Sequence, residues 1–204
     1  MSFPGRILLR AAQWSQRAIS TWRVNRLRLM EGLYHQRMEI GFGTCFNVPV
    51  RSTGRGTLLI GVDNTFGLLQ APRLGTGEIL LEPRRKTARV LIGERNCFSN
   101  NVSILANGEV SIGDGCQFGD QVAIYDCDFH EVNPDTRQLT DGLVRPVHIG
   151  NNVWLSSRVM VLKGVSIGDN SVVGAMSVVT KSIPPNCVAA GNPARIIRAI
   201  EQLT

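Results

Sequence analysis

Between Ile149 and Val179, one large aliphatic residue recurs at every sixth position without interruption. A strict period of six fits neither an α-helix nor a strand that alternates along its whole length. It is typical of a parallel β-helix, in which each side of a coil contributes one short strand and one turn. A β-sandwich is the alternative, but its strands vary in length and would lose this phase. The repeat positions are Ile149, Leu155, Val161, Ile167, Val173 and Val179.

The same spacing appears earlier in the chain with interruptions. The step from Ile104 to Ile112 is eight residues instead of six, which predicts a two-residue bulge near Asn107 and Gly108. Glycine, asparagine and aspartate fill many positions between the repeats, and these residues tolerate turn conformations. We therefore expect further coils before Ile149. Their repeat positions are Ile92, Phe98, Ile104, Ile112, Phe118 and Ile124, with degraded opening coils at Ile40, Phe46, Ile60 and Phe66.

Two segments break the repeat, and we interpret both as loop excursions from the β-helix wall. Residues 70–90 carry two prolines and the basic run Arg84-Arg85-Lys86, and residues 125–146 separate Ile124 from Ile149. Long loops in compact domains tend to be functional. The predicted organisation is a helical leader at 1–38, a β-helix at 39–186, and a C-terminal segment with a short helix at 187–204.

The net charge of +6 lies entirely in the leader. Residues 1–38 contain seven arginines against Glu31 alone, whereas the remainder has fifteen basic and fifteen acidic residues. On a helix, Arg6, Arg10 and Arg17 share one face and Trp14 and Trp22 the other, which predicts a basic amphipathic helix. Such a helix caps the first coil or lies on an anionic membrane surface. Nucleic acid is not expected as a partner, because no recognised motif supports it.

Cysteine usage and hydropathy indicate a cytosolic protein. The five cysteines are an odd number without a CxxC pair, and packing in a reducing compartment explains them best. No apolar run approaches the roughly 18–20 residues of a membrane-spanning helix. Arginines interrupt the N-terminal apolar residues, which does not fit a secretory signal. With 204 residues, 43% of them hydrophobic, the chain is long enough for one main domain.

The loop at 125–146 contains His130, within Asp126-Cys127-Asp128-Phe129-His130-Glu131. A metal site would need closely spaced ligands on neighbouring coils, and the chain has only three histidines. An imidazole titrates near neutrality, and a partner on one ring nitrogen fixes the tautomer of the other. The loop therefore favours general-base chemistry over metal binding or a histidine without a role. Asp126, Asp128, Glu131 or a backbone carbonyl would serve to orient the ring.

About half of the chain, from Ile92 to Ala199, resembles the hexapeptide-repeat acyltransferases, in particular the galactoside and maltose acetyltransferases and the acetyltransferases of polysaccharide and lipopolysaccharide assembly. The motifs are Arg145 to Trp154 (RPVHIGNNVW), Val178 to Pro185 (VVTKSIPP) and Ala190 to Arg195 (AGNPAR). The resemblance implies a left-handed β-helix, a homotrimer, and acetyl-CoA lying between adjacent β-helices. No metal is expected to be required for catalysis.

The resemblance also implies roles for individual residues. His130 matches the catalytic histidine, and Ser157 matches a residue whose backbone N–H faces the thioester carbonyl. Asn100 matches an asparagine that contacts the acceptor, and we place Asp128 and Glu131 beside it at the acceptor. The positions expected to line the coenzyme A groove are Trp154, Ala175, Thr180, Lys181, Arg195 and Arg198.

The function expected from these features is acetyl-CoA-dependent O-acetylation of a sugar or glycan, in surface polysaccharide or lipopolysaccharide synthesis, with His130 as the base. An N-acetyltransferase of an amino sugar or nucleotide-linked amino sugar is the second candidate, because the chemistry of His130 does not separate an amine from a hydroxyl. A non-catalytic scaffold is the third, and an antibiotic-modifying acetyltransferase of the same fold is the fourth.

Overall fold

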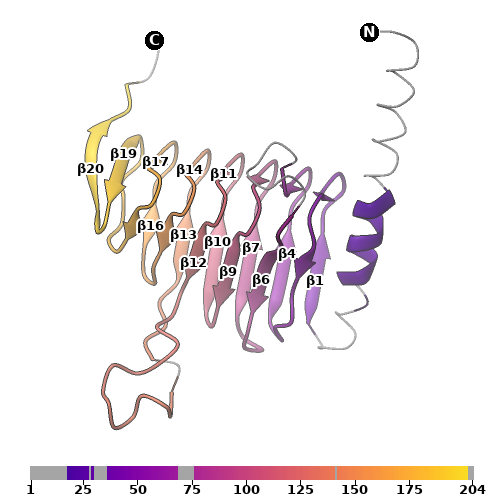
Figure 1. Ribbon diagram of the computed structural model, residues 1–204, viewed down its shortest axis with the longest axis horizontal. Helices are drawn as coiled ribbons and strands as arrows, with labels where there is room; N and C mark the ends of the chain where they lie inside the picture. Colours follow the sequence, from indigo (N-terminus) through magenta and orange to yellow (C-terminus); the bar gives the residue numbers. More distant parts are fainter. Residues whose placement is uncertain (1–17, 28, 30–35, 69–75, 141, 202–204) are drawn as a thin grey trace.

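The computed structural model describes residues 18–27, 29, 36–68, 76–140 and 142–201. Its strands form three parallel sheets that face one another around a single core, so that each coil passes once through sheet A, sheet B and sheet C (Figure 1). This arrangement confirms the parallel β-helix predicted from the six-residue period. We call the three edges of the prism corner AB, corner BC and corner CA, after the sheets that the chain connects there.

The strands of each sheet are stacked in sequence order along the axis. Sheet A contains β1 (Arg37–Ile40), β4 (Thr57–Ile60), β7 (Arg89–Ile92), β10 (Glu109–Ile112), β13 (Val147–Ile149) and β16 (Ser166–Ile167). Sheet B contains β2 (Cys45–Phe46), β5 (Thr65–Phe66), β8 (Cys97–Phe98), β11 (Gln117–Phe118), β14 (Trp154–Leu155), β17 (Val172–Val173), β19 (Cys187–Gly191) and β20 (Ala194–Ala199). Sheet C contains β3 (Val50–Arg51), β6 (Ile79–Pro83), β9 (Ser103–Ala106), β12 (Ala123–Tyr125), β15 (Met160–Val161) and β18 (Val178–Val179).

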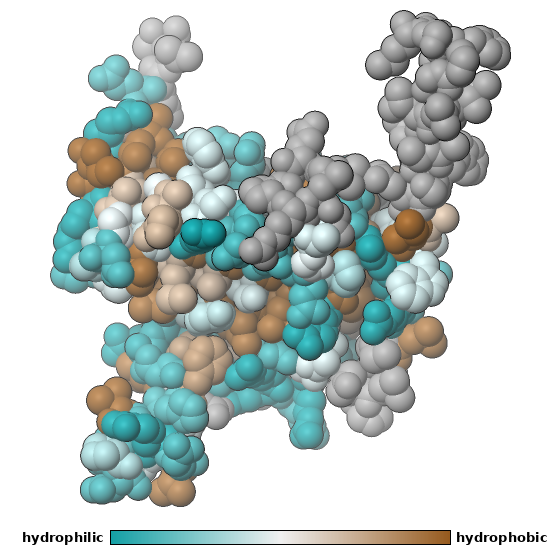
Figure 2. Space-filling model, in the orientation of Figure 1, coloured by the Kyte–Doolittle hydropathy of each residue, from teal (hydrophilic) through white to brown (hydrophobic). Residues whose placement is uncertain are grey.

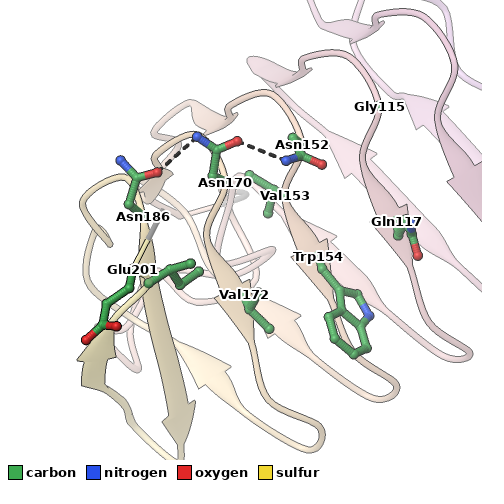
Figure 3. A pocket seen from close by; sticks show the side chains of 10 residues that line it. Gly115, Gln117, Asn152, Val153, Trp154, Asn170, Val172, Asn186 and Glu201 are labelled. Atoms are coloured by element: carbon green, nitrogen blue, oxygen red, sulfur yellow. Dashed lines mark hydrogen bonds between the residues drawn. The ribbon is translucent and has the colours of Figure 1, made fainter. Parts of the chain in front are cut away.

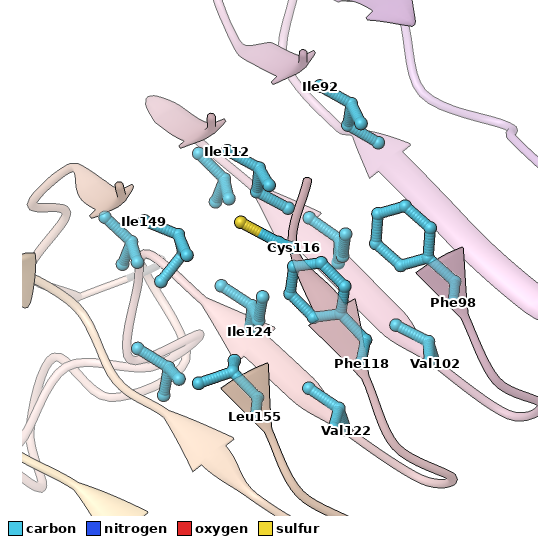
Figure 4. Packing of buried hydrophobic residues seen from close by; sticks show 14 of the residues in the cluster. Ile92, Phe98, Val102, Ile112, Cys116, Phe118, Val122, Ile124, Ile149 and Leu155 are labelled. Atoms are coloured by element: carbon cyan, nitrogen blue, oxygen red, sulfur yellow. The ribbon is translucent and has the colours of Figure 1, made fainter. Parts of the chain in front are cut away.

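Every repeat position from Ile149 to Val179 is buried, as is each earlier one except the half-buried Ile40. Four phenylalanines of sheet B form a column along the axis, with ring centroids 4.9, 4.5 and 4.3 Å apart. Figure 4 shows Phe98 and Phe118 of this column, which Leu155 continues. The column consists of Phe46, Phe66, Phe98 and Phe118.

The extra residues at Asn107 and Gly108 lie at corner CA, between the four-residue strands β9 and β10.

All five cysteines are free thiols, and three of them are buried. Cys116 occupies the small-residue position of its coil at corner AB, where its sulfur donates to the carbonyl of Gly150 at 3.1 Å. Burial raises the pKa of the Cys116 thiol to about 11. The thiol therefore stays protonated and serves as a packed core residue.

A helix at residues 18–27 covers the open end of the first coil. The Ser20 hydroxyl accepts the backbone N–H of Phe46 at 2.8 Å, and Arg23 Nη1 donates to the carbonyl of Phe46 at 2.9 Å. Leu27 is buried in the core. These contacts confirm the capping interpretation for this part of the leader, since they satisfy backbone groups that would otherwise be an exposed strand edge. The tryptophan and arginines expected before Ala18 lie outside the described residues.

The excursion expected over residues 70–90 is largely wrong. Ile79–Pro83 forms β6, which pairs with β3 and β9, and Arg89 begins β7. The residues of β6 alternate between buried and half-buried positions, as in an ordinary wall strand. The sequence did not reveal this strand because Pro83 ends it and a charged turn follows directly. That turn contains Arg84, Arg85 and Lys86. Residues 69–75 lie outside the described chain.

The short helix expected at the C-terminus is also wrong for the described residues. Residues 187–199 form an antiparallel hairpin of β19 and β20, turning at Asn192 and Pro193, and it extends sheet B at the last coil. The β-branched Ile196 and Ile197 favour a strand, and pairing with β19 decides the conformation. Residues 202–204 lie outside the described chain.

Candidate functional site

The loop between β12 and β13 projects from corner CA, and its root is fixed by a buried carboxylate (Figure 1). Asp126 is fully buried, and its two oxygens accept the backbone N–H groups of Asn107 at 2.8 Å and Gly108 at 2.7 Å. Cys127 and Val144 form an antiparallel bridge across the root. The two-residue insertion at corner CA therefore provides the donors that hold the loop on the wall.

Two further contacts hold the segment just before His130. Asp128 forms an ion pair with Lys163, which comes from the next coil. The ring of Phe129 packs edge-on against Tyr125, with centroids 5.4 Å apart, and the guanidinium of Arg84 lies 5.0 Å from its centroid. The segment just before His130 is therefore held by side chains from two other coils, Lys163 on Asp128 and Arg84 on Phe129.

The imidazole of His130 is exposed, and its Nδ1 lies 3.3 Å from the backbone carbonyl oxygen of Arg137. A carbonyl oxygen only accepts, so this contact requires the proton on Nδ1 and leaves the Nε2 lone pair free. The nearby carboxylates have other partners: Asp128 binds Lys163, and Glu131 accepts from Thr140 at 3.3 Å. Among the possible orienting groups of the sequence, the backbone carbonyl is the one in contact.

Asn100, Ser157 and Ala175 lie at a different edge, corner BC. Asn100 is fully buried, and its Oδ1 accepts the N–H of Leu68 at 3.2 Å, whereas its Nδ2 has no partner in the described chain. The backbone N–H groups of Ser156 and Arg158 donate to carbonyls of neighbouring coils. The N–H of Ser157 takes no part in these described backbone hydrogen bonds. Gly119 lies directly beneath, where a Cβ would collide with the Ser157 nitrogen.

Trp154 is half-exposed on sheet B and lines a groove of about 480 Å³ beside corner AB (Figure 3). Along the rim, the side-chain amides of Asn152, Asn170 and Asn186 form a ladder with hydrogen bonds of 2.9 and 3.0 Å. Glu201 closes the groove at the C-terminal end. The groove thus joins one flat aromatic face to a row of amides.

The exposed cations expected to bind coenzyme A are available, but they are not gathered on one face. Lys181 and Thr180 lie at corner CA, whereas Arg195 and Arg198 lie on β20. None of the three cations forms an ion pair with a described residue, and each arginine donates only to a carbonyl beside it, at 2.9 and 3.2 Å. Their remaining N–H groups suit phosphate oxygens, so these residues fit a phosphate-bearing ligand.

The structure therefore does not bring the candidate residues into one site within a single chain. His130 projects from corner CA, whereas Asn100 and Ser157 lie at corner BC, with sheet C between them. At about 3.3 Å per residue, the four-residue strand β9 alone spans about 13 Å. In the part of the chain that the structure describes, no three His, Cys, Asp or Glu side chains gather as a metal site.

Sequence reasoning missed the contacts that place His130. Arg84 and Lys163 come from other coils and reach the loop only through the stacking of coils, whereas Arg137 lies in the loop itself, seven residues after His130. The one available signal was the eight-residue step at Asn107 and Gly108, which marks the corner where Asp126 is anchored.

Known proteins share this fold and sequence pattern. The bacterial transferase hexapeptide family (six repeats) matches residues 146–181. Galactoside O-acetyltransferase of Escherichia coli (strain K12) is 46% identical over 107 residues, which are 52% of this chain and 52% of that protein. A solved galactoside acetyltransferase in complex with coenzyme A is 30% identical, with a TM-score of 0.55, over 86% of this chain and 70% of that one.

This chain belongs to the hexapeptide-repeat acyltransferase family. A hexapeptide-repeat-containing acetyltransferase from Vibrio cholerae O1 biovar eltor, complexed with acetyl-coenzyme A, is 25% identical over 88% of this chain and 78% of that one, with a TM-score of 0.58. These likenesses confirm the left-handed β-helix predicted for a member of this family. The chain spans about half the length of the curated relatives it matches.

Proposed function

We propose that the protein is an acetyl-CoA-dependent O-acetyltransferase that acts on a sugar or glycan, in surface polysaccharide or lipopolysaccharide synthesis. The observation that carries this proposal is the His130 imidazole, whose Nδ1 is held by the Arg137 carbonyl and whose Nε2 is left free on an anchored loop. Family membership supports the acyl-transfer chemistry. Acetyl-CoA, when bound, supplies the activated acyl group.

In this mechanism His130 removes the proton from the acceptor hydroxyl with Nε2, as the oxygen attacks the thioester carbonyl. General-base catalysis of this kind contributes roughly 10²–10⁴-fold. The Ser157 N–H stabilises the negative charge that develops on the carbonyl oxygen, an effect of a few kcal/mol in comparable sites. Protonated His130 then returns its proton to the departing thiolate. Lys181, Arg195 and Arg198 bind the phosphates of coenzyme A, and Trp154, Ala175 and Thr180 line the rest of the coenzyme A groove expected between adjacent β-helices.

We propose a homotrimer because His130 and Ser157 lie at different edges of one chain. A neighbouring copy that sets its corner CA beside corner BC brings the two residues together, with Asn100 at the acceptor alongside Asp128 and Glu131. Sedimentation should then give three times the chain mass of 22.3 kDa.

Mixing two inactive variants tests the shared site directly. His130→Ala and Asn100→Ala chains, refolded together in equal amounts, should regain about a quarter of the wild-type activity, since that share of interfaces carries both intact residues. The same mixture without refolding is the control. A fully active monomer, or a mixture that regains nothing while each variant still folds, contradicts this arrangement.

The acceptor class is tested by following thiol release from acetyl-CoA with sugars, nucleotide-linked sugars, amino sugars and lipid-linked saccharides. The proposal predicts acetyl esters on hydroxyl groups. A product that carries only an amide would make the protein an N-acetyltransferase. A chain that binds acetyl-CoA and transfers its acetyl group to none of these acceptors contradicts the proposal.

We further propose a cytosolic enzyme that contacts an anionic membrane surface reversibly through the leader. In the described chain no helix has the length and apolar character to cross a bilayer. The outer face of helix 18–27 exposes Ile19 and Trp22, with the Arg26 guanidinium 5.9 Å from the Trp22 ring, while the inner face caps the first coil. Each basic residue near an anionic leaflet contributes about 1 kcal/mol.

Flotation with phosphatidylglycerol vesicles tests this contact. The wild-type chain should float at low salt and less at high salt, and Trp22→Ser should float several-fold less while the capping contacts remain. Ile197→Ser, which removes an exposed apolar side chain at the opposite end, is the matched control. Equal flotation of the wild type and Trp22→Ser would leave the leader as a cap alone.

A further inference from the structure

Four exposed cations gather at corner CA on one side of the His130 loop: Arg55, Arg84, Arg85 and Lys86. We call them the basic corner. We propose that the basic corner binds an anionic group of the acceptor, so that the substrate is an acidic sugar or glycan bearing carboxylate or phosphate. This inference rests on the proposed function and names the class of acceptor that the same site takes.

The backbone places these cations side by side. The turn of residues 52–56 stacks on the turn of residues 84–88, where Arg55 N donates to the carbonyl of Arg84 at 3.4 Å and Gly56 N to that of Pro83 at 2.9 Å. Gly56 is required here, because a Cβ would collide with the carbonyl oxygen of Ala88. The two neighbouring coils therefore present their charges on one small surface.

The carboxylate beside the basic corner neutralises only one of its charges. Glu82 accepts from Thr53 at 2.5 Å and from Arg84 at 2.9 Å. Burial raises the pKa of Glu82, but these two hydrogen bonds and the positive charges of Arg84 and Arg51 outweigh it, so its pKa is lowered. Arg55 and Lys86 form no ion pair with any residue in the described ranges. A positive surface therefore remains for an anion to bind.

Arg84 connects this surface to the proposed base. Its guanidinium lies over the ring of Phe129, 5.0 Å from the centroid, and Phe129 directly precedes His130 in the chain. Lys163 is paired with Asp128 on the other side of the same loop. An acceptor held at the basic corner would thus lie beside the loop that carries the imidazole.

The cations proposed to bind the acceptor and those proposed to bind coenzyme A lie at different heights along the β-helix axis. Along corner CA, the turn that holds Arg84 lies two turns before the loop, and Lys181 lies two turns after it. With neighbouring strands about 4.8 Å apart, each lies about 10 Å along the axis from the root of the loop. Arg195 and Arg198 lie on β20 at the C-terminal end with Lys181. Cations for the coenzyme phosphates and the basic corner are therefore on opposite sides of His130.

The loop itself fits a carbohydrate better than an apolar acceptor. Its surface is mainly hydrophilic (Figure 2), although Val132, Leu139 and Leu143 expose apolar side chains. Glu82 balances Arg84, whereas Arg55 and Lys86 have no ion-pair partner in the described ranges, and their charges would repel each other unless an anion balanced them. An acidic saccharide supplies that anion and the hydroxyl to be acetylated in one molecule.

The experiment compares matched acceptors that differ in charge. Methyl galactoside is the neutral acceptor, and methyl galacturonoside and galactose 6-phosphate are the carboxylate and phosphate acceptors. The wild type should show a kcat/KM about tenfold higher for at least one anionic acceptor than for the neutral one, and 0.5 M salt should reduce this ratio. Arg55→Gln combined with Lys86→Gln should lower the ratio about fivefold to tenfold, with the KM for acetyl-CoA unchanged.

Arg95→Asn is the control, because Arg95 is also an exposed cation but lies at corner AB, so its substitution should not change the ratio. If the double variant instead raises the KM for acetyl-CoA and affects all acceptors equally, the basic corner binds coenzyme phosphate and the inference is wrong. If the wild type acetylates neutral and anionic acceptors equally well, the inference also fails, while the proposed acetyl transfer stands. Transfer to none of the acceptors would contradict both.

Discussion

The coils from β13 to β18 and the loop that enters them at Val147 are neighbours in sequence, but they are held in place by different forces. In the coils, each strand has only two or three residues, and burial of one aliphatic side chain per strand, or of two in β13, fixes its position. In the loop, polar contacts fix the position of the chain. Asp126 accepts two backbone N–H groups, Asp128 forms an ion pair with Lys163, and His130 contacts the Arg137 carbonyl.

This difference means that stability and activity should respond to different residues. Removing a buried side chain from the wall loses apolar burial and leaves a cavity. Removing a polar contact in the loop changes where the imidazole lies and leaves the core intact. The four substitutions that follow test how completely the two regions separate.

The largest effect is expected for His130→Ala. Loss of the base should lower kcat by about 10²–10⁴-fold, with the KM for acetyl-CoA and the unfolding midpoint nearly unchanged, because the side chain is exposed. Thiol release during acetyl transfer measures kcat and KM, and a thermal scan measures the unfolding midpoint. His148→Ala, which removes an exposed histidine of the wall, is the control and should keep full activity. Full activity of His130→Ala would remove the proposed base.

The reverse behaviour is expected for Phe98→Ala in the wall. Phe98 stacks on Phe66 and Phe118 at 4.5 and 4.3 Å, and its removal should destabilise the protein by about 3–5 kcal/mol. Urea unfolding measures this loss, and kcat per folded protein should stay near that of the wild type. Leu139→Ala, at an exposed loop position, should change stability by less than about 0.5 kcal/mol. Equal losses of stability in Phe98→Ala and Leu139→Ala would mean that the phenylalanine column stabilises the protein no more than an exposed loop residue does.

The same contrast explains what could be predicted from the sequence. The coils follow a local rule, so Ile149 and the later repeat positions could be assigned to the core from spacing alone. β6 was missed because its turn carries Arg84, Arg85 and Lys86, which obscure the period without altering the pairing of Leu81 with Ile104. The C-terminal hairpin was missed because pairing of β20 with β19 is a tertiary contact that the spacing does not encode.

The loop could be located from the sequence, and His130 could be chosen from its chemistry. The residues that surround His130 could not be predicted. Arg137 is seven residues away and meets the imidazole only through the course of the loop. Lys163 and Arg84 come from other coils, so their contacts depend on the axial stacking. Asn100 was expected at the acceptor, but only the folded chain shows that it is buried and that its Nδ2 has no partner among the described residues.

A smaller effect that involves both regions is expected for Asp126→Ala. The substitution leaves the N–H groups of Asn107 and Gly108 without their acceptors, which should destabilise the protein by about 2–3 kcal/mol and lower kcat about tenfold. Asp126→Asn keeps one acceptor oxygen, so both losses should be intermediate. Asp135→Asn, at an exposed position of the same loop, is the control. Loss of stability without loss of kcat would show that the root of the loop does not position His130.

The smallest effect is expected at the end of the wall, for Ser20→Ala. Its hydroxyl accepts one backbone N–H, that of Phe46, at the first coil, so the loss should be about 1 kcal/mol with no change in kcat. Hydrogen exchange should locate it, since the Phe46 amide should exchange faster while amides of β14 and β17 do not. Asn25→Ala on the exposed side of the helix is the matched control. If the Phe46 amide exchanges as slowly in Ser20→Ala as in the wild type, the Ser20 hydroxyl does not hold the helix on the first coil. The end of the wall would then be stabilised mainly by burial of Leu27 and Val24, as its middle is by burial of its aliphatic side chains, and polar anchoring would matter chiefly in the loop.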